Sequence, residues 1–262
     1  MQSAKENQSY VTVEFLKKRA QTDREINEES HRMLKIGQGM KVLNVGCGPD
    51  TDSASLREAV GLSGLVVGVD LDPKMIKQAN STCAPSANVL HLVGDAHWLP
   101  FEDGKFDGIY ARRLLQVLPS ASAPIVFAEL QRVLKPEGRL VAMDTDWASA
   151  SVNFSNLELE RRLMSFFRDH MRPNGLAGRQ LLGLAHSSGL GDVEVKVVST
   201  VIREFAESPF SDWLISEAVK DKVASAEELA SWRGELERKT AEQAFLFHVG
   251  TVIVSAKKKE KK

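Results

Sequence analysis

Two glycines and one acid stand where an α/β protein would hold a nucleoside. Residues 42–49 read Val-Leu-Asn-Val-Gly-Cys-Gly-Pro, an apolar run that breaks at Gly46 and Gly48. Such a run is typical of a buried strand that ends in a tight turn, where glycine lets a ligand approach the backbone closely. A second apolar run, residues 64–69, ends in Asp70. A carboxylate after the second strand can accept hydrogen bonds from ribose hydroxyls, so the pattern predicts a nucleoside-containing cofactor.

The residues of the turn help to distinguish between a dinucleotide and other nucleoside-containing cofactors. A dinucleotide fold has Gly-x-Gly-x-x-Gly, but here Thr51 takes the place of the third glycine and Pro49 lacks a backbone N–H. Asp50 and Asp52 would repel a diphosphate, and we expect them to suit a cationic ligand. S-adenosylmethionine, a nucleoside that carries a sulfonium and an amino acid, therefore fits better than NAD. An NAD oxidoreductase is the weakest alternative.

Strand and helix signals alternate from residue 40 onward. Strands are predicted at residues 41–45, 65–70, 89–93, 106–110 and 139–144, and helices at residues 53–60, 73–79 and 125–134. This alternation predicts a parallel sheet with helices on both faces, whose ligand lies at the carboxyl ends of the strands. Five candidate site residues fall at or just beyond such ends: Gly46, Asp70, Asp95, Arg112 and Asp144.

The pattern changes after residue 144. Helices are predicted at residues 157–170, 179–188, 209–223 and 226–243, and strands at residues 193–202 and 245–254. If the last two strands pair as a hairpin, about 40 residues of helix are inserted between them, and an insertion of that length is usually functional. We divide the chain into an N-terminal helical cap (1–39), a cofactor-binding core (40–150), a C-terminal part of the sheet with helical lid insertions (151–256) and a basic tail (257–262), which we expect to be solvated.

Five ordered blocks carry a family resemblance over roughly residues 40 to 145. They are Val42-Leu-Asn-Val-Gly-Cys-Gly48, Val67-Gly-Val-Asp70, Val93-Gly-Asp-Ala96 with Leu99-Pro-Phe101, Phe106-Asp107, and Leu134-Lys-Pro-Glu-Gly-Arg-Leu140. In these blocks the chain resembles the class I S-adenosylmethionine-dependent methyltransferases, in the branch of ubiquinone/menaquinone-type and secondary-metabolite enzymes that act on small molecules. The resemblance implies a Rossmann-like α/β fold, with a mostly parallel seven-stranded sheet, helices on both faces, and N-terminal and late helical lid elements.

The resemblance also implies roles in binding S-adenosyl-L-methionine. Gly46, Cys47 and Gly48 would form the turn around the methionine portion, with Cys47 as a small packed side chain. Asp70 would accept both ribose hydroxyls, and Leu71 would pack against the adenine. Three further positions complete the set. Asp95 would accept the adenine amino group, the Ala96 N–H would face the ring, and Arg112 would stand beside the cofactor, where many relatives have a small or hydroxyl residue.

The chemistry of methyl transfer does not demand a particular catalytic residue. A sulfonium methyl is already activated, so the enzyme mainly aligns a nucleophile with it, and a base is needed only for an acceptor of high pKa. Asp144 and Asp146 are candidate bases at the end of the fifth strand, with the alternative that they hold neighbouring elements. His97 is a further tentative candidate. Histidine, cysteine and acidic residues are not clustered in the sequence as metal ligands would be, so we predict no metal site.

The helices outside the core should roof the acceptor site. The N-terminal helix signal, at residues 11–36, and the late helices are the expected roof, which would exclude water from the reaction. Six aromatic residues lie in or beside the late helices, and we expect most of them to be core: Phe154, Phe166, Phe167, Phe210, Trp213 and Trp232.

The composition of the chain limits the classes of partner that it can bind. The chain has 262 residues with 34 basic and 35 acidic side chains, which argues against a nucleic-acid backbone as main partner. No apolar stretch approaches the length of a membrane span, and the polar start of the chain lacks the apolar core of a signal peptide, so we expect a cytoplasmic protein. A small organic acceptor, methylated on oxygen, nitrogen or carbon, is the leading hypothesis. The alternatives are a nucleic-acid or protein methyltransferase, and a protein that uses this fold and cofactor for other chemistry.

Overall fold

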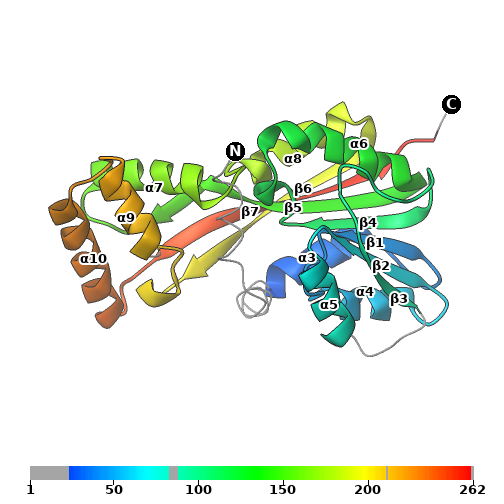
Figure 1. Cartoon of the computed structure of the whole chain (residues 1–262), viewed down its shortest axis with the longest axis horizontal. Coiled ribbons are helices and arrows are strands. Elements are labelled where there is room, and N and C mark those ends of the chain that lie inside the picture. Colours follow the sequence, from blue (N-terminus) through cyan, green and yellow to red (C-terminus); the bar gives the residue numbers. More distant parts are fainter. Residues whose placement is uncertain (1–23, 83–87, 211, 261–262) are drawn as a thin grey trace.

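The computed structural model describes residues 24–82, 88–210 and 212–260 and shows one mixed sheet flanked by helices (Figure 1). The seven strands are ordered β3-β2-β1-β4-β5-β7-β6, with β1 to β5 parallel and β7 antiparallel to both of its neighbours. Their bounds are β1 Lys41–Val45, β2 Leu65–Asp70, β3 Val89–Val93, β4 Phe106–Arg112, β5 Leu134–Val152, β6 Leu190–Ile202 and β7 Phe247–Lys258. The predicted fold, a mostly parallel seven-stranded α/β sheet, is confirmed.

Helices cover both faces of the parallel part. The α-helices are α3 Arg24–Leu34, α4 Ser53–Val60, α5 Pro73–Thr82, α6 Ala123–Val133, α7 Leu157–Met171, α8 Ala177–Ser187, α9 Asp212–Lys220 and α10 Ala226–Ala241. Alternate residues of the central strands pack in opposite directions, because side chains alternate along a strand. Val42 joins the cluster that contains α3 and α4, and Leu43 joins the cluster that contains α6 and α8. The strands are therefore buried on both faces, which explains their continuous apolar sequence.

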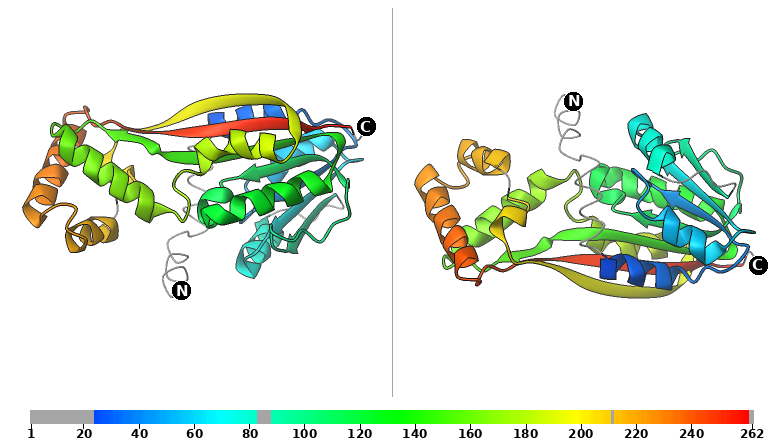
Figure 2. Two further views of the ribbon diagram at one scale, coloured as in Figure 1. Left: turned by 90° about the horizontal axis from the view of Figure 1, so that it is seen from above. Right: turned by 90° about the horizontal axis from the view of Figure 1, so that it is seen from below.

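The three long strands β5, β7 and β6 extend past the parallel core and carry a second group of helices. We call α7, α9 and α10 with the 3-10 turn Phe205–Glu207 the helical lobe; Figure 2 shows it at the far end of these strands. The lobe has its own aromatic core, in which Trp232 is fully buried and packs against Phe167 and Phe210. Phe154 and Phe166 are buried in the same cluster. The expectation that these aromatic residues are core is confirmed for all except Trp213, whose side chain lies outside the described residues.

The hairpin predicted at the end of the chain is present. β6 and β7 pair in antiparallel fashion from Leu190↔Lys258 to Ile202↔Phe247, and the two last helices of the lobe lie between them in sequence. β5 is much longer than the predicted strand at residues 139–144. It continues because β7 supplies an antiparallel partner beyond the point where β4 ends, with a register shift between Asp146 and Ser151.

The C-terminal basic run is only partly the solvated tail that we expected. β7 extends to Lys258, whose side chain is buried and whose Nζ donates to the backbone oxygens of Gln131, Arg132 and Leu134 at the end of α6. Lys257 pairs with Glu137. The prediction was wrong for Lys258, because an ammonium group can be buried where it satisfies the free carbonyls at a helix C-terminus. Lys257 is part-exposed and is held as a residue of β7.

Part of the predicted N-terminal cap lies outside the described residues. The amphipathic pattern at residues 11–36 is represented by α3, whose Ile26, Met33 and Leu34 are buried against the sheet. Among the residues that the structure describes, no helix combines the length and the apolar character needed to cross a bilayer.

Candidate functional site

The glycine turn after β1 is fixed to the neighbouring strand. Gly46 and Gly48 both have left-handed backbone angles, with φ of +72° and +57°. The N–H groups of Gly46 and Cys47 both donate to the Val69 oxygen, at 2.8 and 3.0 Å. Only glycine adopts such angles without strain, so the sequence of this turn and its tight shape are directly linked. Cys47 is buried, and burial raises the pKa of its thiol far above the ordinary range, which makes it a packed side chain and not a nucleophile.

Asp70, the last residue of β2, binds this turn through its side chain. Its Oδ2 accepts the Gly48 N–H at 2.8 Å, and its Oδ1 accepts the Asp72 N–H at 2.9 Å. Partial burial raises the pKa of Asp70, while these two N–H donors act in the opposite direction. Leu71 beside it is 59% exposed, an apolar side chain held at the surface next to the carboxylate. The sequence-predicted pair of turn and strand-end acid is therefore assembled at one edge of the sheet.

Asp95 lies in the loop that follows β3 and is tied to the same edge. The Gly94 N–H donates to the Asp70 backbone oxygen at 3.0 Å. The Asp95 side chain is 48% exposed and accepts the His97 N–H at 2.9 Å, with His97 Nδ1 at 2.6 Å. These contacts with His97 lower the pKa of Asp95, so it is a carboxylate near neutral pH. Ala96 is buried between them.

Arg112, at the end of β4, reaches across to the segment that follows the turn. Its Nη2 lies 2.9 Å from Asp52 Oδ2, its Nε donates to the same oxygen at 3.0 Å, and it also bonds to Thr51. Asp52 is buried, with His31 of α3 at 3.9 Å on its other oxygen. The Arg112 guanidinium thus neutralises a buried acid next to the turn, and its predicted place beside the cofactor stays a prediction.

The two acids of the turn do not present their charge to a ligand. Asp52 is paired with Arg112, and the Asp50 side chain points inward to His91 of β3, with Nε2 to Oδ2 at 2.7 Å. The expectation that Asp50 and Asp52 would face a cationic ligand was wrong, because both side chains are buried, with Arg112 paired to Asp52 and the His91 ring bonded to Asp50. Asp50 Oδ1 also accepts the Ser53 N–H at 3.2 Å, at the first residue of α4, and so caps this helix.

The candidate bases at the end of β5 hold neighbouring segments in place. Asp144 is 1% exposed, and its carboxylate accepts the N–H groups of Leu115 and Gln116 at 3.0 and 3.3 Å. Burial raises the pKa of Asp144 to about 7. Asp146 accepts two hydrogen bonds from Arg179 of α8, at 2.9 and 2.8 Å. Of the two roles that the sequence left open, this geometry favours the structural one.

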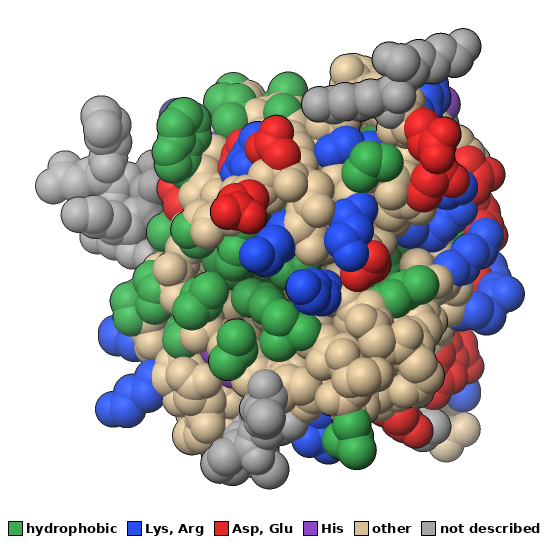
Figure 3. Space-filling view, turned by 90° about the vertical axis from the view of Figure 1, so that its right-hand side faces the viewer, with side chains coloured by type: hydrophobic (Ala, Val, Ile, Leu, Met, Phe, Trp, Pro, Cys, Tyr) green, Lys and Arg blue, Asp and Glu red, His purple; other side chains and the backbone are tan. Residues whose placement is uncertain are grey.

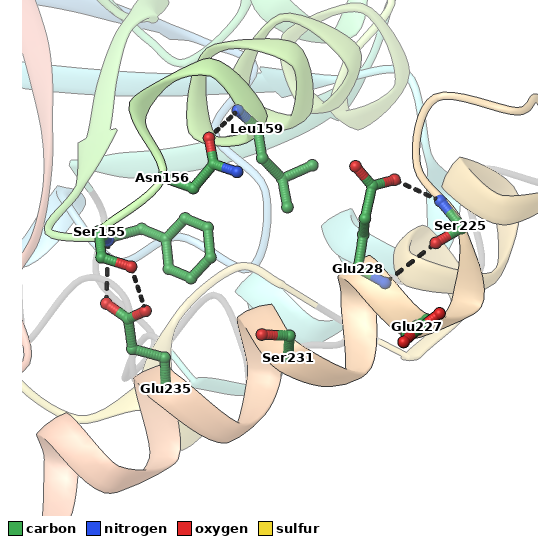
Figure 4. A pocket seen from close by; sticks show the side chains of 9 residues that line it. Ser155, Asn156, Leu159, Ser225, Glu227, Glu228, Ser231 and Glu235 are labelled. Atoms are coloured by element: carbon green, nitrogen blue, oxygen red, sulfur yellow. Dashed lines mark hydrogen bonds between the residues drawn. The ribbon is translucent and has the colours of Figure 1, made fainter.

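A groove in the helical lobe lies far from these residues along the long strands. It has a volume of about 310 Å³ and is lined by Phe154, Ser155, Asn156, Leu159, Ser225, Glu227, Glu228, Ser231 and Glu235 (Figure 4). Its two central acids already have partners: Glu228 binds the Ser225 N–H and Arg162, and Glu235 binds Ser155. The groove is thus a junction between α7 and α10 whose polar groups satisfy each other.

Sequence reasoning missed one residue of the assembled site, His91. Its ring lies below the turn and binds Asp50, but in the sequence it is one polar position in an otherwise apolar strand. A single buried histidine is more often a packed residue than a functional one, so nothing in the pattern singled it out.

Comparisons with known proteins agree with this architecture. The family described as "Methyltransferase domain" matches residues 42–138. An uncharacterized 37.1 kDa protein of transposon Tn4556 from Streptomyces fradiae is 35% identical over 194 residues, 73% of this chain and 56% of that protein. Demethylmenaquinone methyltransferase from Staphylococcus aureus (strain MRSA252) is 36% identical over 112 residues, 43% of this chain and 46% of the enzyme. The chain thus spans about half the length of the curated relatives that it matches.

Solved structures share the fold. Haemonchus contortus phosphoethanolamine N-methyltransferase 2, in complex with S-adenosyl-L-methionine, superposes with a TM-score of 0.58 at 18% identity, over 90% of this chain and 53% of that one. At this level of identity the likeness concerns the fold, and the residues of the site have to be argued from their own geometry.

Proposed function

This chain belongs to the class I S-adenosylmethionine-dependent methyltransferases, and from that membership we propose that it binds S-adenosyl-L-methionine at the Gly46–Asp70 edge and methylates a small organic acceptor. The observation that carries the proposal is the junction of the left-handed glycine turn with the Asp70 carboxylate.

The residues present fit the cofactor. An ionised carboxylate has about four acceptor positions, and Asp70 uses one on each oxygen for the Gly48 and Asp72 N–H groups. The remaining positions can accept the two ribose hydroxyls. Leu71, exposed beside it, offers an apolar surface to the adenine, and Asp95 offers a half-exposed acceptor to the adenine amino group.

The turn suits the amino-acid end of the cofactor. Gly46 and Gly48 bring bare backbone to the surface, so a flexible chain such as methionine can lie against it. Arg112 lies on the far side of this turn and neutralises Asp52, which keeps a buried negative charge from opposing the ligand carboxylate. In this proposal Arg112 supports the turn from the side.

The chain's task in the reaction is alignment. When bound, S-adenosylmethionine supplies a methyl group already activated on a sulfonium, so the protein has to place the acceptor in line with it and exclude water. Asp144 and Asp146 contribute by fixing the segment after β4 and the start of α8 at the end of β5. His97 keeps Asp95 ionised and oriented. A base role for these three residues stays a prediction.

Several observations support a small organic acceptor. The sequence relative with an assigned activity is named for a quinone precursor, demethylmenaquinone, and the superposed structure for phosphoethanolamine. The net charge is −1, and charged side chains of both signs are mixed on the face shown in Figure 3. A nucleic-acid partner would favour a surface of positive sign.

Calorimetric titration tests the cofactor assignment. We expect the wild-type chain to bind S-adenosylmethionine and not NADH. Asp70→Ala should weaken the binding of S-adenosylmethionine at least tenfold, about 1.4 kcal/mol, the scale of a lost hydrogen bond to a charged group. Glu102→Gln, which removes an exposed acid whose nearest cation is Lys105 at 4.0 Å, is the matched control and should bind as wild type. NADH binding by the wild type, or unchanged affinity in Asp70→Ala, would contradict the assignment.

A further inference from the structure

Asp50 occupies a backbone conformation that glycine usually supplies. Its φ is +61°, two residues after Gly48 in the same turn. An L-residue with a Cβ is strained in this region, although Asp and Asn tolerate it better than most. A strained residue persists only where its surroundings hold it, so the contacts of the Asp50 side chain explain why the turn keeps its shape.

The Asp50 carboxylate is fully occupied by the chain. Oδ1 accepts the Ser53 N–H at 3.2 Å and contacts the Ser53 hydroxyl, while Oδ2 lies 2.7 Å from His91 Nε2. The exposed fractions of the two side chains are 1% for Asp50 and 2% for His91. A buried pair of this kind is costly to break, because the remaining partner loses both water and its hydrogen bond.

His91 is itself held by three elements and forms a fixed anchor. It belongs to β3, its Nδ1 lies 2.9 Å from Asn80 Oδ1 of α5, and its ring packs against Gly68 of β2. A Cβ on Gly68 would lie 2.8 Å from His91 Cδ2 and 3.0 Å from Cys47 Sγ, so glycine there makes room for the ring under the turn. The imidazole is thus wedged between the sheet and the turn.

We propose that Asp50 and His91 are positioning residues that set the shape of the glycine turn and, through it, the affinity for the cofactor. This rests on the proposed function. The connection runs through backbone contacts: the Asp50 N–H donates to the Cys47 oxygen at 3.0 Å, and the Gly48 N–H between them is bonded to the Asp70 carboxylate. If the Asp50 side chain loses its contacts, the turn can leave its left-handed conformation. The Gly48 N–H, which orients the Asp70 carboxylate, then moves with the turn. Neither residue needs to touch the cofactor.

The expected loss of affinity depends on the fraction of time that the turn spends in the conformation that binds the cofactor. When a site is competent only part of the time, the apparent Kd rises by the inverse of that fraction. His91→Leu leaves the Asp50 carboxylate buried without its hydrogen-bond partner on Oδ2. If the turn then spends about a tenth of its time in the competent shape, the Kd for S-adenosylmethionine rises about tenfold. His91→Gln places an amide nitrogen near the position of Nε2, and we expect its Kd to stay within about threefold of wild type because the hydrogen bond to Asp50 is retained.

Calorimetry with S-adenosylmethionine, paired with urea unfolding, tests the proposal. Leu236→Ala is the matched control: Leu236 is fully buried in the helical lobe, so this variant loses stability without touching the turn. We expect weak binding in His91→Leu, near wild-type binding in His91→Gln, and wild-type binding in Leu236→Ala. Asp50→Asn, which retains an acceptor for the Ser53 N–H and a donor toward His91, should also bind within about threefold. Asp50→Ala, which retains neither, should bind weakly and replaces His91→Leu if that variant does not fold.

The outcomes separate this proposal from the proposed function. Wild-type affinity in folded His91→Leu overturns the positioning role and leaves the cofactor assignment intact. Equal loss of affinity in His91→Leu and Leu236→Ala also overturns it, since the loss would then follow stability alone. Where His91→Leu does not fold, Asp50→Ala, which removes both carboxylate contacts, takes its place, and wild-type affinity in folded Asp50→Ala overturns the positioning role. Absence of binding in the wild type defeats the proposed function, and this inference with it.

Discussion

Asp144 should make the stability of this protein fall as the pH rises from about 4 to 7. Its carboxyl group is completely buried, and burial raises its pKa from 3.8 to about 7, against the effect of the two N–H donors and of Arg113. The folded state therefore binds a proton that the unfolded state releases near pH 4. Stability falls with pH wherever the folded state binds more protons, so this contribution is fully present below about pH 4 and is lost progressively as the pH rises toward 7.

The magnitude follows from the shift in pKa. One pKa unit corresponds to 1.36 kcal/mol, so a shift of about three units is worth roughly 4 kcal/mol in total. Between pH 5 and pH 9 the part that is lost is about 3 kcal/mol. This is a large share of the 5–15 kcal/mol by which folded proteins are typically stable.

Asp144→Asn removes the titration and is the perturbation that isolates this effect. Asparagine, like a protonated aspartate, retains one acceptor for the Leu115 N–H, so the variant and the wild type should have similar stability at pH 5. Between pH 5 and pH 7 the wild type should become the less stable of the two, and the gap should level off above pH 7 at about 3 kcal/mol. Urea unfolding at several pH values measures this. A constant difference between the two proteins across pH 5 to 9 would refute the reasoning, and would show that Asp144 is ionised in the folded state.

Two further predictions concern the long strands and the lobe that they carry. Lys258→Met should destabilise the fold by about 1.5–3 kcal/mol, since it removes a charged donor from three carbonyls at the end of α6, while Lys259→Met, at an exposed residue, should change stability by less than about 0.5 kcal/mol. Thermal unfolding of both variants checks this, and equal effects would contradict the capping role. Leu236→Ala should cost about 2–5 kcal/mol in urea unfolding, because it opens a cavity under α10; a loss below 1 kcal/mol would show that the lobe core is not well packed.

The parts of the fold that could be predicted are those set by local pattern. The strand at residues 41–45 and the helix at residues 53–60 were predicted with their observed bounds, because an apolar run and a helical period are both readable over five to eight residues. The length of β5 could not be read in this way. It depends on β7, a partner more than a hundred residues away, and the sequence of β5 past Asp144 is too polar to indicate a strand alone.

In the candidate site, too, some features could be predicted from local sequence pattern and others could not. The positions of Gly46, Gly48, Asp70 and Asp95 follow from where strands end, and the structure brings them to one edge. The direction in which each side chain points does not follow from the sequence. Asp50 and Asp52 are acids in a turn, for which exposure to solvent is the ordinary expectation, and their burial depends on His91 of β3 and Arg112 of β4, which bind their carboxylates.

The buried acids also change the argument for the cofactor. The negative charge of Asp50 and Asp52 was expected to exclude a diphosphate, but both side chains are buried and bound within the protein, Asp50 by His91 and Asp52 by Arg112. The family match and the arrangement of Asp70, Leu71 and Asp95 now support S-adenosylmethionine in its place.

A crystal structure of the complex with S-adenosylhomocysteine tests the central claim most directly. We predict that both ribose hydroxyls will donate to the Asp70 carboxylate, with the adenine between Leu71 and Asp95 and the amino-acid end on the bare backbone of Gly46 to Gly48. A nucleoside bound at any other edge of the sheet, or an Asp70 carboxylate that makes no contact with the ribose, would contradict it.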